Sequence, residues 1–341
     1  MSSSFRCFLL FACIVSLLSC EKGLTPPSPG VDTVYTVAFE SSASGNMNIY
    51  TVSSTGDDIR QITDSPYNDI SPCFSPDGQR IAYISNYDIF ICNADGTGKT
   101  RLTDTPYTEQ GCVFSPDGNS IAFSREESGN ENIFVMDIAS GEERRLTTAS
   151  GRDFKPLFTP DGETIIFLSD RDSPIICALY SCNLSTGEVE RINHSLFSQL
   201  EPDISPSGDM IAFRKVFGAD SDIYYLTYPE LAEHLLFDDS GYTGSPVFSP
   251  DGNSIAFVRE IDYTDKIYIL DIATGDTTRI SDIDEGINYA SPCWSPDGNE
   301  LVYASDKSGR WEIYRFILDT GEELLLTDIG ASATNPVASP D

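Results

Sequence analysis

Basic residues and histidines are both scarce in this 341-residue chain. It contains 21 Lys and Arg against 53 Asp and Glu, a formal net charge of −32, and only two histidines. So acidic a surface repels phosphate groups, which argues against nucleic acid or an anionic membrane face as a partner. We attribute most of the acidity to solubility, with a cation held by some of the carboxylates as the alternative.

Motifs that mark common catalytic sites are also missing. The sequence contains no G-x-S-x-G nucleophile turn, no P-loop, no HExxH zinc motif and no CxxC pair, each of which would carry a defined chemistry. His194 and His234 fall near the ends of predicted outer strands, where a packing or surface role suits them better than that of a base. We therefore predict no catalytic residue and no cofactor, with glycoside chemistry by a carboxylate pair left open.

The first twenty residues differ from the rest. One arginine precedes the apolar run "CFLLFACIVSLL", the layout of a secretory signal that is too short to span a membrane as a helix. The ending "LLSC" resembles a bacterial lipobox, which implies a signal peptide over residues 1–19 and lipidation of Cys20. An ordinary signal peptide or a buried cysteine is the alternative. Residues 20–33, rich in Pro and Gly, predict a flexible tether.

These features predict an exported protein of the bacterial cell envelope, on the periplasmic face or the cell surface, that meets the membrane only through its lipid. Six of the nine cysteines lie beyond the leader. Cys177 and Cys182 would stand about 17 Å apart on one extended strand, beyond the reach of a disulfide. We expect buried free thiols, with one long-range disulfide as the alternative.

A four-residue turn recurs along the rest of the chain. "SPDG" or a close variant begins at seven positions that lie 40 to 46 residues apart: Ser75, Ser115, Thr159, Ser205, Ser249, Ser295 and Ser339. A period of this length is typical of propeller blades. Proline presets φ at the second turn residue, and glycine supplies the left-handed conformation that starts the return strand. We therefore assign the aspartate to turn chemistry rather than to metal binding or catalysis.

Each copy of the repeat contains four short strands. Segments such as "IAFVR" and "IYILDI" are nearly continuous apolar runs, as in sheets covered on both faces. We predict an all-β, seven-bladed β-propeller of four-stranded blades over residues 34–341, and a monomer. The first copy lacks an entering strand, which the C-terminal "NPVASPD" can supply. Blade 1 would then combine residues 34–63 with 336–341 and close the ring.

The stretch "FSPDGNSIAF…NIFVMDIASGEERRLT" (residues 114–147) resembles the WD40-like (PD40) repeat of TolB-type propellers. The resemblance extends over essentially all of residues 34–341 and implies the propeller fold. TolB proteins carry six blades behind an α/β domain, whereas seven repeats and a tether are expected here. Similar propellers also precede the hydrolase domain of prolyl oligopeptidase-like enzymes, and we expect no such domain in this chain.

Candidate binding residues lie where the crossovers between blades enter the innermost strands. Counting three residues back from the proline position places Asp69, Glu109, Asp153, Gln199, Thr243 and Tyr289 around the channel mouth. Our hypothesis is that the three carboxylates form an acidic rim for a cationic ligand, Ca²⁺ or a basic segment of a partner. The alternative is a solvated rim, with Arg152 and Lys155 neutralising the charge.

Tyr242 and Trp311 fall on the same predicted face, either as exposed anchors or packed on their own loops. We interpret the chain as a scaffold that binds a protein or peptide in the cell envelope. A carbohydrate- or small-ligand-binding propeller is the first alternative, and it requires Trp311, Tyr242 and Tyr289 to be exposed together. A lyase or hydrolase that uses rim carboxylates, or a lyase that holds a metal with several histidines, is the second.

Overall fold

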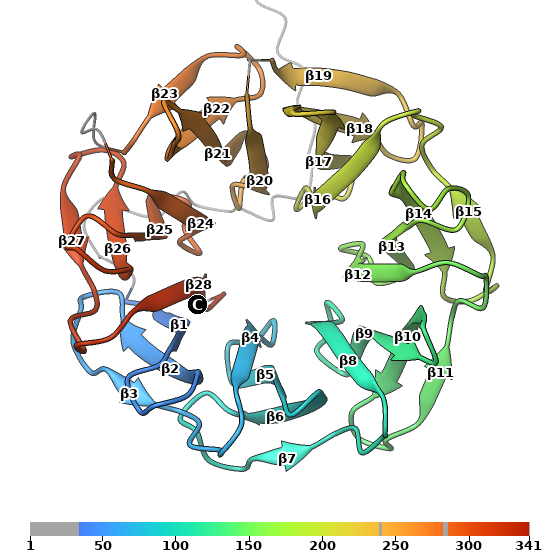
Figure 1. Ribbon diagram of the computed structural model, residues 1–341, viewed down its shortest axis with the longest axis horizontal. Helices are drawn as coiled ribbons and strands as arrows, with labels where there is room; N and C mark the ends of the chain where they lie inside the picture. The colour runs from blue at the N-terminus through green and yellow to red at the C-terminus, as the bar shows by residue number, and fades with distance from the viewer. Residues whose placement is uncertain (1–33, 239–240, 282–285, 341) are drawn as a thin grey trace, which may run out of the picture. The chain divides into compact units, whose positions relative to one another are not determined.

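The computed structural model describes residues 34–238, 241–281 and 286–340. Over these ranges the chain forms strands and no helix, and the strands make seven four-stranded antiparallel sheets set in a ring (Figure 1). The predicted all-β, seven-bladed propeller is confirmed. The predicted signal peptide, tether and lipidated Cys20 lie outside the described residues. The described ranges contain no helix that could cross a membrane.

Each blade is a meander whose first strand lies nearest the centre of the ring. From the centre outwards, the strands of blades 1 to 4 are β28 (Ala333–Ala338), β1 (Thr36–Ser41), β2 (Asn48–Ser53), β3 (Arg60–Gln61); β4 (Asp69–Phe74), β5 (Arg80–Ser85), β6 (Asp88–Asn93), β7 (Thr100–Arg101); β8 (Thr108–Phe114), β9 (Ser120–Glu127), β10 (Asn130–Asp137), β11 (Glu143–Arg145); and β12 (Asp153–Phe158), β13 (Thr164–Ser169), β14 (Ala178–Asn183), β15 (Val189–Arg191). Those of blades 5 to 7 are β16 (Ser198–Ile204), β17 (Met210–Phe217), β18 (Asp220–Thr227), β19 (Glu233–Phe237); β20 (Thr243–Phe248), β21 (Ser254–Ile261), β22 (Thr264–Asp271), β23 (Thr277–Arg279); and β24 (Tyr289–Trp294), β25 (Glu300–Ser305), β26 (Glu312–Ile317), β27 (Glu323–Leu325).

The recurring turn joins the first and second strands of a blade, as its chemistry predicted. In blade 2 the N–H of Gly78 donates to the carbonyl of Ser75 (2.8 Å), and Gly78 has φ of +67°. The Asp77 carboxylate accepts hydrogen bonds from the Ser75 hydroxyl (2.5 Å) and from the N–H of Gln79 (3.1 Å). The Ser75 hydroxyl lowers the pKa of Asp77. This aspartate is therefore occupied in holding the turn.

The core lies between neighbouring blades. Ala82 and Ile84 of β5 share one buried cluster with Ile121 and Phe123 of β9. The central alanine of each "IAF" triplet is fully buried, and its small side chain lets adjacent sheets approach closely. Within every blade the second and third strands also carry one stacked aromatic pair. These pairs are Phe39–Tyr50, Tyr83–Phe90, Phe123–Phe134, Phe167–Tyr180, Phe213–Tyr224, Phe257–Tyr268 and Tyr303–Tyr314.

The two ends of the described chain meet in blade 1. Strand β28 pairs antiparallel with β1, with Val37 opposite Ala338. Beyond the strands, the N–H of Ser339 donates to the carbonyl of Thr36 (2.7 Å), and the N–H of Thr36 donates to the Ser339 hydroxyl (3.0 Å). The predicted closure of the ring by N- and C-terminal strands is confirmed. The six cysteines of the described residues are all free, three of them buried.

Candidate functional site

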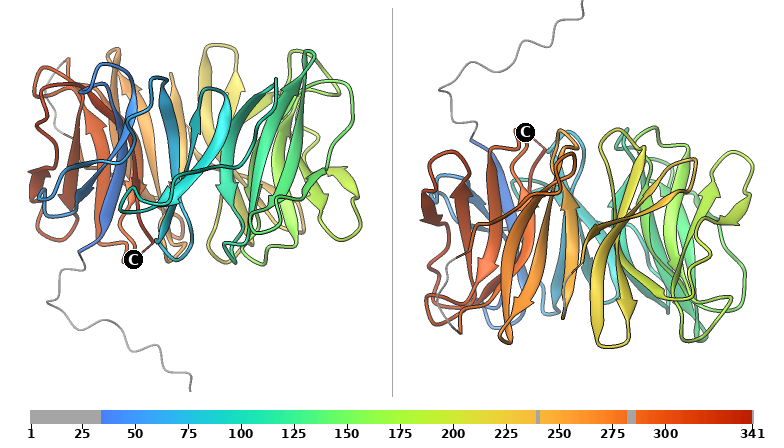
Figure 2. Two further views of the ribbon diagram at one scale, coloured as in Figure 1. Left: turned by 90° about the horizontal axis from the view of Figure 1, so that it is seen from below. Right: turned by 90° about the horizontal axis from the view of Figure 1, so that it is seen from above.

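The ring has two faces of different character (Figure 2). Turns between first and second strands, and between third and fourth strands, lie on one side, which we call the turn face. Loops between second and third strands, and the crossovers between blades, lie on the other side, the loop face. The second-to-third-strand loop takes residues 86–87 in blade 2 but residues 170–177 in blade 4. Variation of this kind marks the side where binding residues usually lie.

The six predicted rim residues occupy equivalent places, but they do not form an open rim. Each is the first or second residue of an innermost strand: Asp69, Glu109, Asp153, Gln199, Thr243 and Tyr289. Their side chains are at most 1% exposed. The backbone N–H groups of Asp69, Glu109 and Gln199 donate to carbonyls in the loop of the preceding blade at 2.8–2.9 Å. That loop covers these residues, which therefore lie buried at the junction between blades.

An inner ring of residues instead lies two positions further along each innermost strand, at a β-bulge. These residues all have φ between +51° and +59°: Ser71, Gly111, Lys155, Glu201, Ser245, Ser291 and Asn335. Several of them bond from blade to blade. The N–H of Ser71 donates to Glu40 of blade 1 (2.8 Å), and the N–H of Ser245 donates to Glu201 of blade 5 (2.6 Å). The residues that we predicted by counting back from the proline lie two positions before this inner ring.

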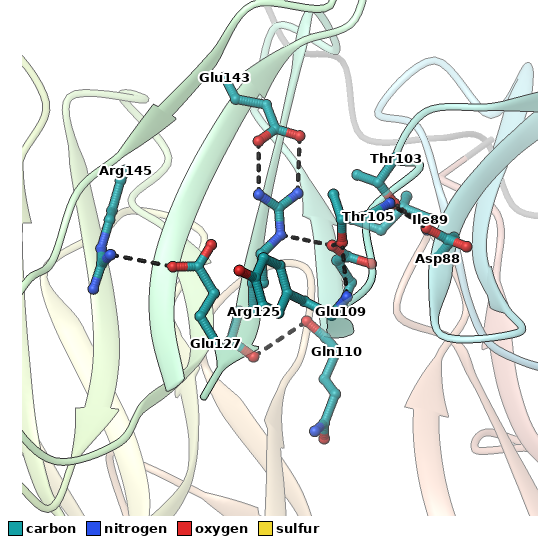
Figure 3. A network of polar contacts seen from close by, with 12 residues as sticks. Asp88, Ile89, Thr103, Thr105, Glu109, Gln110, Arg125, Glu127, Glu143 and Arg145 are labelled. Atoms are coloured by element: carbon teal, nitrogen blue, oxygen red, sulfur yellow. Dashed lines mark hydrogen bonds and ion pairs between the residues drawn. The ribbon is translucent and has the colours of Figure 1, made fainter. Parts of the chain in front are cut away.

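The three predicted carboxylates are held separately, each within its own surroundings. Glu109 accepts hydrogen bonds from Arg125 (2.6 Å) and Thr105 (2.8 Å), and Arg125 also makes a two-bonded pair with Glu143 (Figure 3). Burial raises the pKa of Glu109, while Thr105 and Arg125 partly oppose that shift.

The other two carboxylates have partners of their own. Asp153 pairs with Arg171 (2.7 Å) and accepts a hydrogen bond from Ser169 (2.6 Å), and Asp69 accepts one from Ser65 (2.7 Å). Within the described ranges, no three His, Cys, Asp or Glu side chains gather where they could hold a metal ion. The three carboxylates therefore do not form one shared acidic rim.

In five of the seven blades a cationic side chain, which we did not predict from the sequence, caps the aromatic pair. The distances from the cation to the ring centroid are 4.7 Å for Arg125 over Phe134, 4.7 Å for Arg171 over Tyr180, 4.5 Å for Lys215 over Tyr224, 5.4 Å for Arg259 over Tyr268 and 4.2 Å for Lys307 over Tyr314. A basic residue two or four places after the aromatic of the second strand is the signal that could have found them. A cation over a ring face is attracted by the quadrupole of the ring.

Blade 2 has an open pocket where these other blades have their cation. Its volume is about 340 Å³, and its walls include Asp69, Tyr83, Ser85 and Phe90. A second hollow, of about 660 Å³, lies beside it between blades 2, 3 and 4, and Tyr87 and Lys155 contribute to its lining. Both hollows open on the loop face.

The three aromatic residues considered for a sugar platform are not exposed together. Tyr289 is fully buried and packs against Tyr303 at 5.7 Å. Tyr242 lies under Arg214 (4.9 Å), and Trp311 is partly buried against the core between blades 7 and 1. The condition that we set for the carbohydrate-binding alternative is therefore not met by these residues.

The ring of four-stranded blades, closed by the two ends of the chain, defines this protein as a seven-bladed β-propeller. Residues 86–236 and 199–341 match the family described as the TolB beta propeller domain, and the chain belongs to that family. Residues 30–112 also match the family described as the dipeptidyl peptidase IV N-terminal region.

Among curated relatives, the Tol-Pal system protein TolB of Francisella tularensis is 31% identical over 206 residues, which are 58% of this chain and 47% of that protein. Dipeptidyl-peptidase 5 of Porphyromonas gingivalis is 31% identical over 290 residues, 76% of this chain and 41% of that protein. The chain thus spans about half the length of the curated relatives it matches, or less. Among solved structures, TolB from Acinetobacter baumannii superposes with a TM-score of 0.58 at 18% identity, covering 90% of this chain and 67% of that one. This last likeness shows the fold alone.

Proposed function

We propose that this chain is a non-catalytic scaffold of the bacterial cell envelope that binds a protein or peptide through its loop face. The observation that carries the proposal is the set of large apolar side chains left 38% to 93% exposed on that face: Tyr67, Tyr87, Tyr107, Ile175, Leu196, Phe197 and Tyr263. Exposed tyrosine and other large apolar groups on an otherwise acidic surface are typical of protein interfaces. The 31% identity to a protein named for the Tol-Pal system supports an envelope partner.

Crosslinking followed by affinity capture from the native envelope tests the proposal. The bait would be the full chain, compared with a loop-face double variant, Tyr67→Ser with Tyr87→Asn, in which Asn suits the positive φ of residue 87. The matched control is Ile59→Ser, which removes an exposed apolar side chain from the turn between β2 and β3. We expect one partner to be captured by the wild type and the control and lost by the double variant. Equal capture by all three baits, or no specific capture, would contradict a partner site on the loop face.

A further inference from the structure

The pocket of blade 2 contains one half of an arrangement that is complete elsewhere in the ring. In blades 3 and 4 an arginine lies over the aromatic pair and also pairs with a carboxylate at the start of the innermost strand. Arg125 pairs with Glu109 at 2.6 Å, and Arg171 pairs with Asp153 at 2.7 Å. The cation is thus held by a ring face and an anion together.

Blade 2 keeps the rings and the carboxylate but not the cation. Tyr83 and Phe90 stack at 5.7 Å, as in the other blades. Asp69 stands opposite Ser85 in the strand register, at the place where Glu109 stands opposite Arg125. Among the described residues, no lysine or arginine lies over either ring or forms an ion pair with Asp69. The Oδ2 atom of Asp69 is buried without a hydrogen-bond partner.

The two cations in the walls of the pocket are already engaged elsewhere. Arg101 pairs with Asp88 (2.6 Å) and Asp104 (2.8 Å). Lys99 pairs with Asp64 at 3.0 Å. Neither of them pairs with Asp69, which lines the same pocket as the rings of Tyr83 and Phe90.

Two differences account for the missing cation of blade 2: Ser85 stands where Arg125 stands in blade 3, and the hairpin is too short to supply a residue like Arg171. Strands β5 and β6 span residues 80–93, whereas the equivalent pair spans residues 164–183 in blade 4, so blade 2 has the shorter connection. Asn86 and Tyr87 form its whole loop, with φ of +50° and +71°, as in a tight two-residue turn. In blade 4 the longer loop supplies Arg171, which folds back over Tyr180. No residue of the blade 2 loop is placed to do the same.

We propose that the pocket of blade 2 binds a guanidinium group, supplied by an arginine side chain of the partner that docks on the loop face. The guanidinium lies over Tyr83 and Phe90 and pairs with Asp69, in the place that Arg171 takes in blade 4. Arginine fits better than lysine because its planar group can stack on a ring and bond a carboxylate at the same time. In this chain both carboxylates equivalent to Asp69 are paired with arginine. The identity of the donor as a protein partner rests on the proposed function.

The direct test is a titration of the full chain, followed by nuclear magnetic resonance, with acetyl-Gly-Arg-Gly-amide. The same peptide with citrulline, which has the shape of arginine without its charge, is the matched neutral probe. We expect the arginine peptide to bind at least about tenfold more tightly than the citrulline peptide. Equal affinities would overturn the proposal. Free L-arginine separates the two sources of the group, because tighter binding of the free amino acid than of the peptide would overturn a protein donor.

Two variants tie the binding to this pocket. Asp69→Asn should weaken binding of the arginine peptide by at least about tenfold. Asp276→Asn, in an exposed turn between β22 and β23, should not change the affinity for the peptide. Asp69→Asn should fold normally, since Gln199 and Thr243 occupy the same place in other blades. Ser85→Arg recreates the pair of blade 3 and should both abolish peptide binding and raise the Tm. Retained binding in either pocket variant would refute the site.

Failure of this inference can be told apart from failure of the proposed function. If the partner is captured from the envelope but the arginine peptide does not bind, the proposed scaffold function is supported and the proposed arginine site is refuted. If the arginine peptide binds in a way that requires Asp69, but no partner is captured, the arginine site is supported and the scaffold function is refuted.

Discussion

Asp203 allows a direct test of how burial between blades changes the pKa of a carboxyl group and, through it, the stability of the fold. It lies in β16, and its Oδ2 atom accepts a hydrogen bond from the N–H of Phe248 in the next blade (2.7 Å). Burial raises the pKa of Asp203 from 3.8 to about 6, although backbone hydrogen bonds from Phe248 and Ile204 oppose the shift. The folded protein therefore holds a proton on this group more tightly than the unfolded chain does.

The sign and size of the effect on stability follow from that difference. The protonated carboxyl stabilises the fold below about pH 4, and this contribution is lost as the pH rises through about 6. A shift of about 2 units corresponds to about 3 kcal/mol at neutral pH and above. That figure is an upper limit because Asp203 keeps some contact with solvent. The variant Asp203→Asn retains an oxygen to accept from Phe248 but cannot ionise. It should be more stable than the wild type by about 1 to 3 kcal/mol at pH 8, and this advantage should shrink towards zero near pH 4.

Urea unfolding of both proteins between pH 4 and pH 8, followed by tryptophan fluorescence, measures this difference. Comparing the two chains at each pH cancels the contributions of turn aspartates such as Asp77, whose pKa is lowered and whose effect runs in the opposite direction. Asp276→Asn controls for removal of one negative charge from a surface turn. A difference in unfolding free energy that stays constant from pH 4 to pH 8 would refute the reasoning. So would a variant less stable than the wild type at pH 8.

Two further predictions concern the ring and its buried charges. Deletion of residues 335–341 removes most of β28 and exposes the edge of β1, so we expect a large fall in Tm by circular dichroism. An unchanged Tm would show that the ring does not depend on this closure. Arg125→Met leaves Glu109 and Glu143 without their shared guanidinium and should lower the unfolding free energy by about 3 to 5 kcal/mol. The exposed Arg60→Met should have little effect in the same urea assay, and a similarly small loss for Arg125→Met would contradict the buried network.

The fold was accessible from the sequence because its determinants are local and repeated. Each Ser-Pro-Asp-Gly turn sets its own geometry through bonds within a few residues, as Ser75 and Asp77 show. Once seven turns and seven apolar strand pairs are placed at a regular spacing, few arrangements can bury them all. The closure of blade 1 followed from the one strand missing at the start of the repeat and supplied at the end.

The candidate site was less accessible because it depends on contacts between repeats. Counting from the proline correctly located Asp69 at the start of an innermost strand, but it could not show that the loop of the preceding blade covers that position. It also missed the bulge at Ser71, because a positive φ at a serine leaves no mark in the sequence. The pairing of Asp153 with Arg171 needed the register of neighbouring strands and the path of a loop.

Because the blades are repeats, the pocket of blade 2 can be compared with the equivalent position in every other blade. Blade 1 also lacks a cation over its aromatic pair, but there Ala333 stands opposite Ser41, so the carboxylate is absent as well. If the carboxylate served only to hold an internal cation, blade 2 would keep Asp69 buried although neither Ser85 nor the short hairpin supplies a cation to it. Such a group is costly unless something pairs with it. A cation from outside the chain would pair with the Asp69 carboxylate. We therefore expect the variant Ser85→Arg to have a higher Tm than the wild type and to have lost its binding of the arginine peptide.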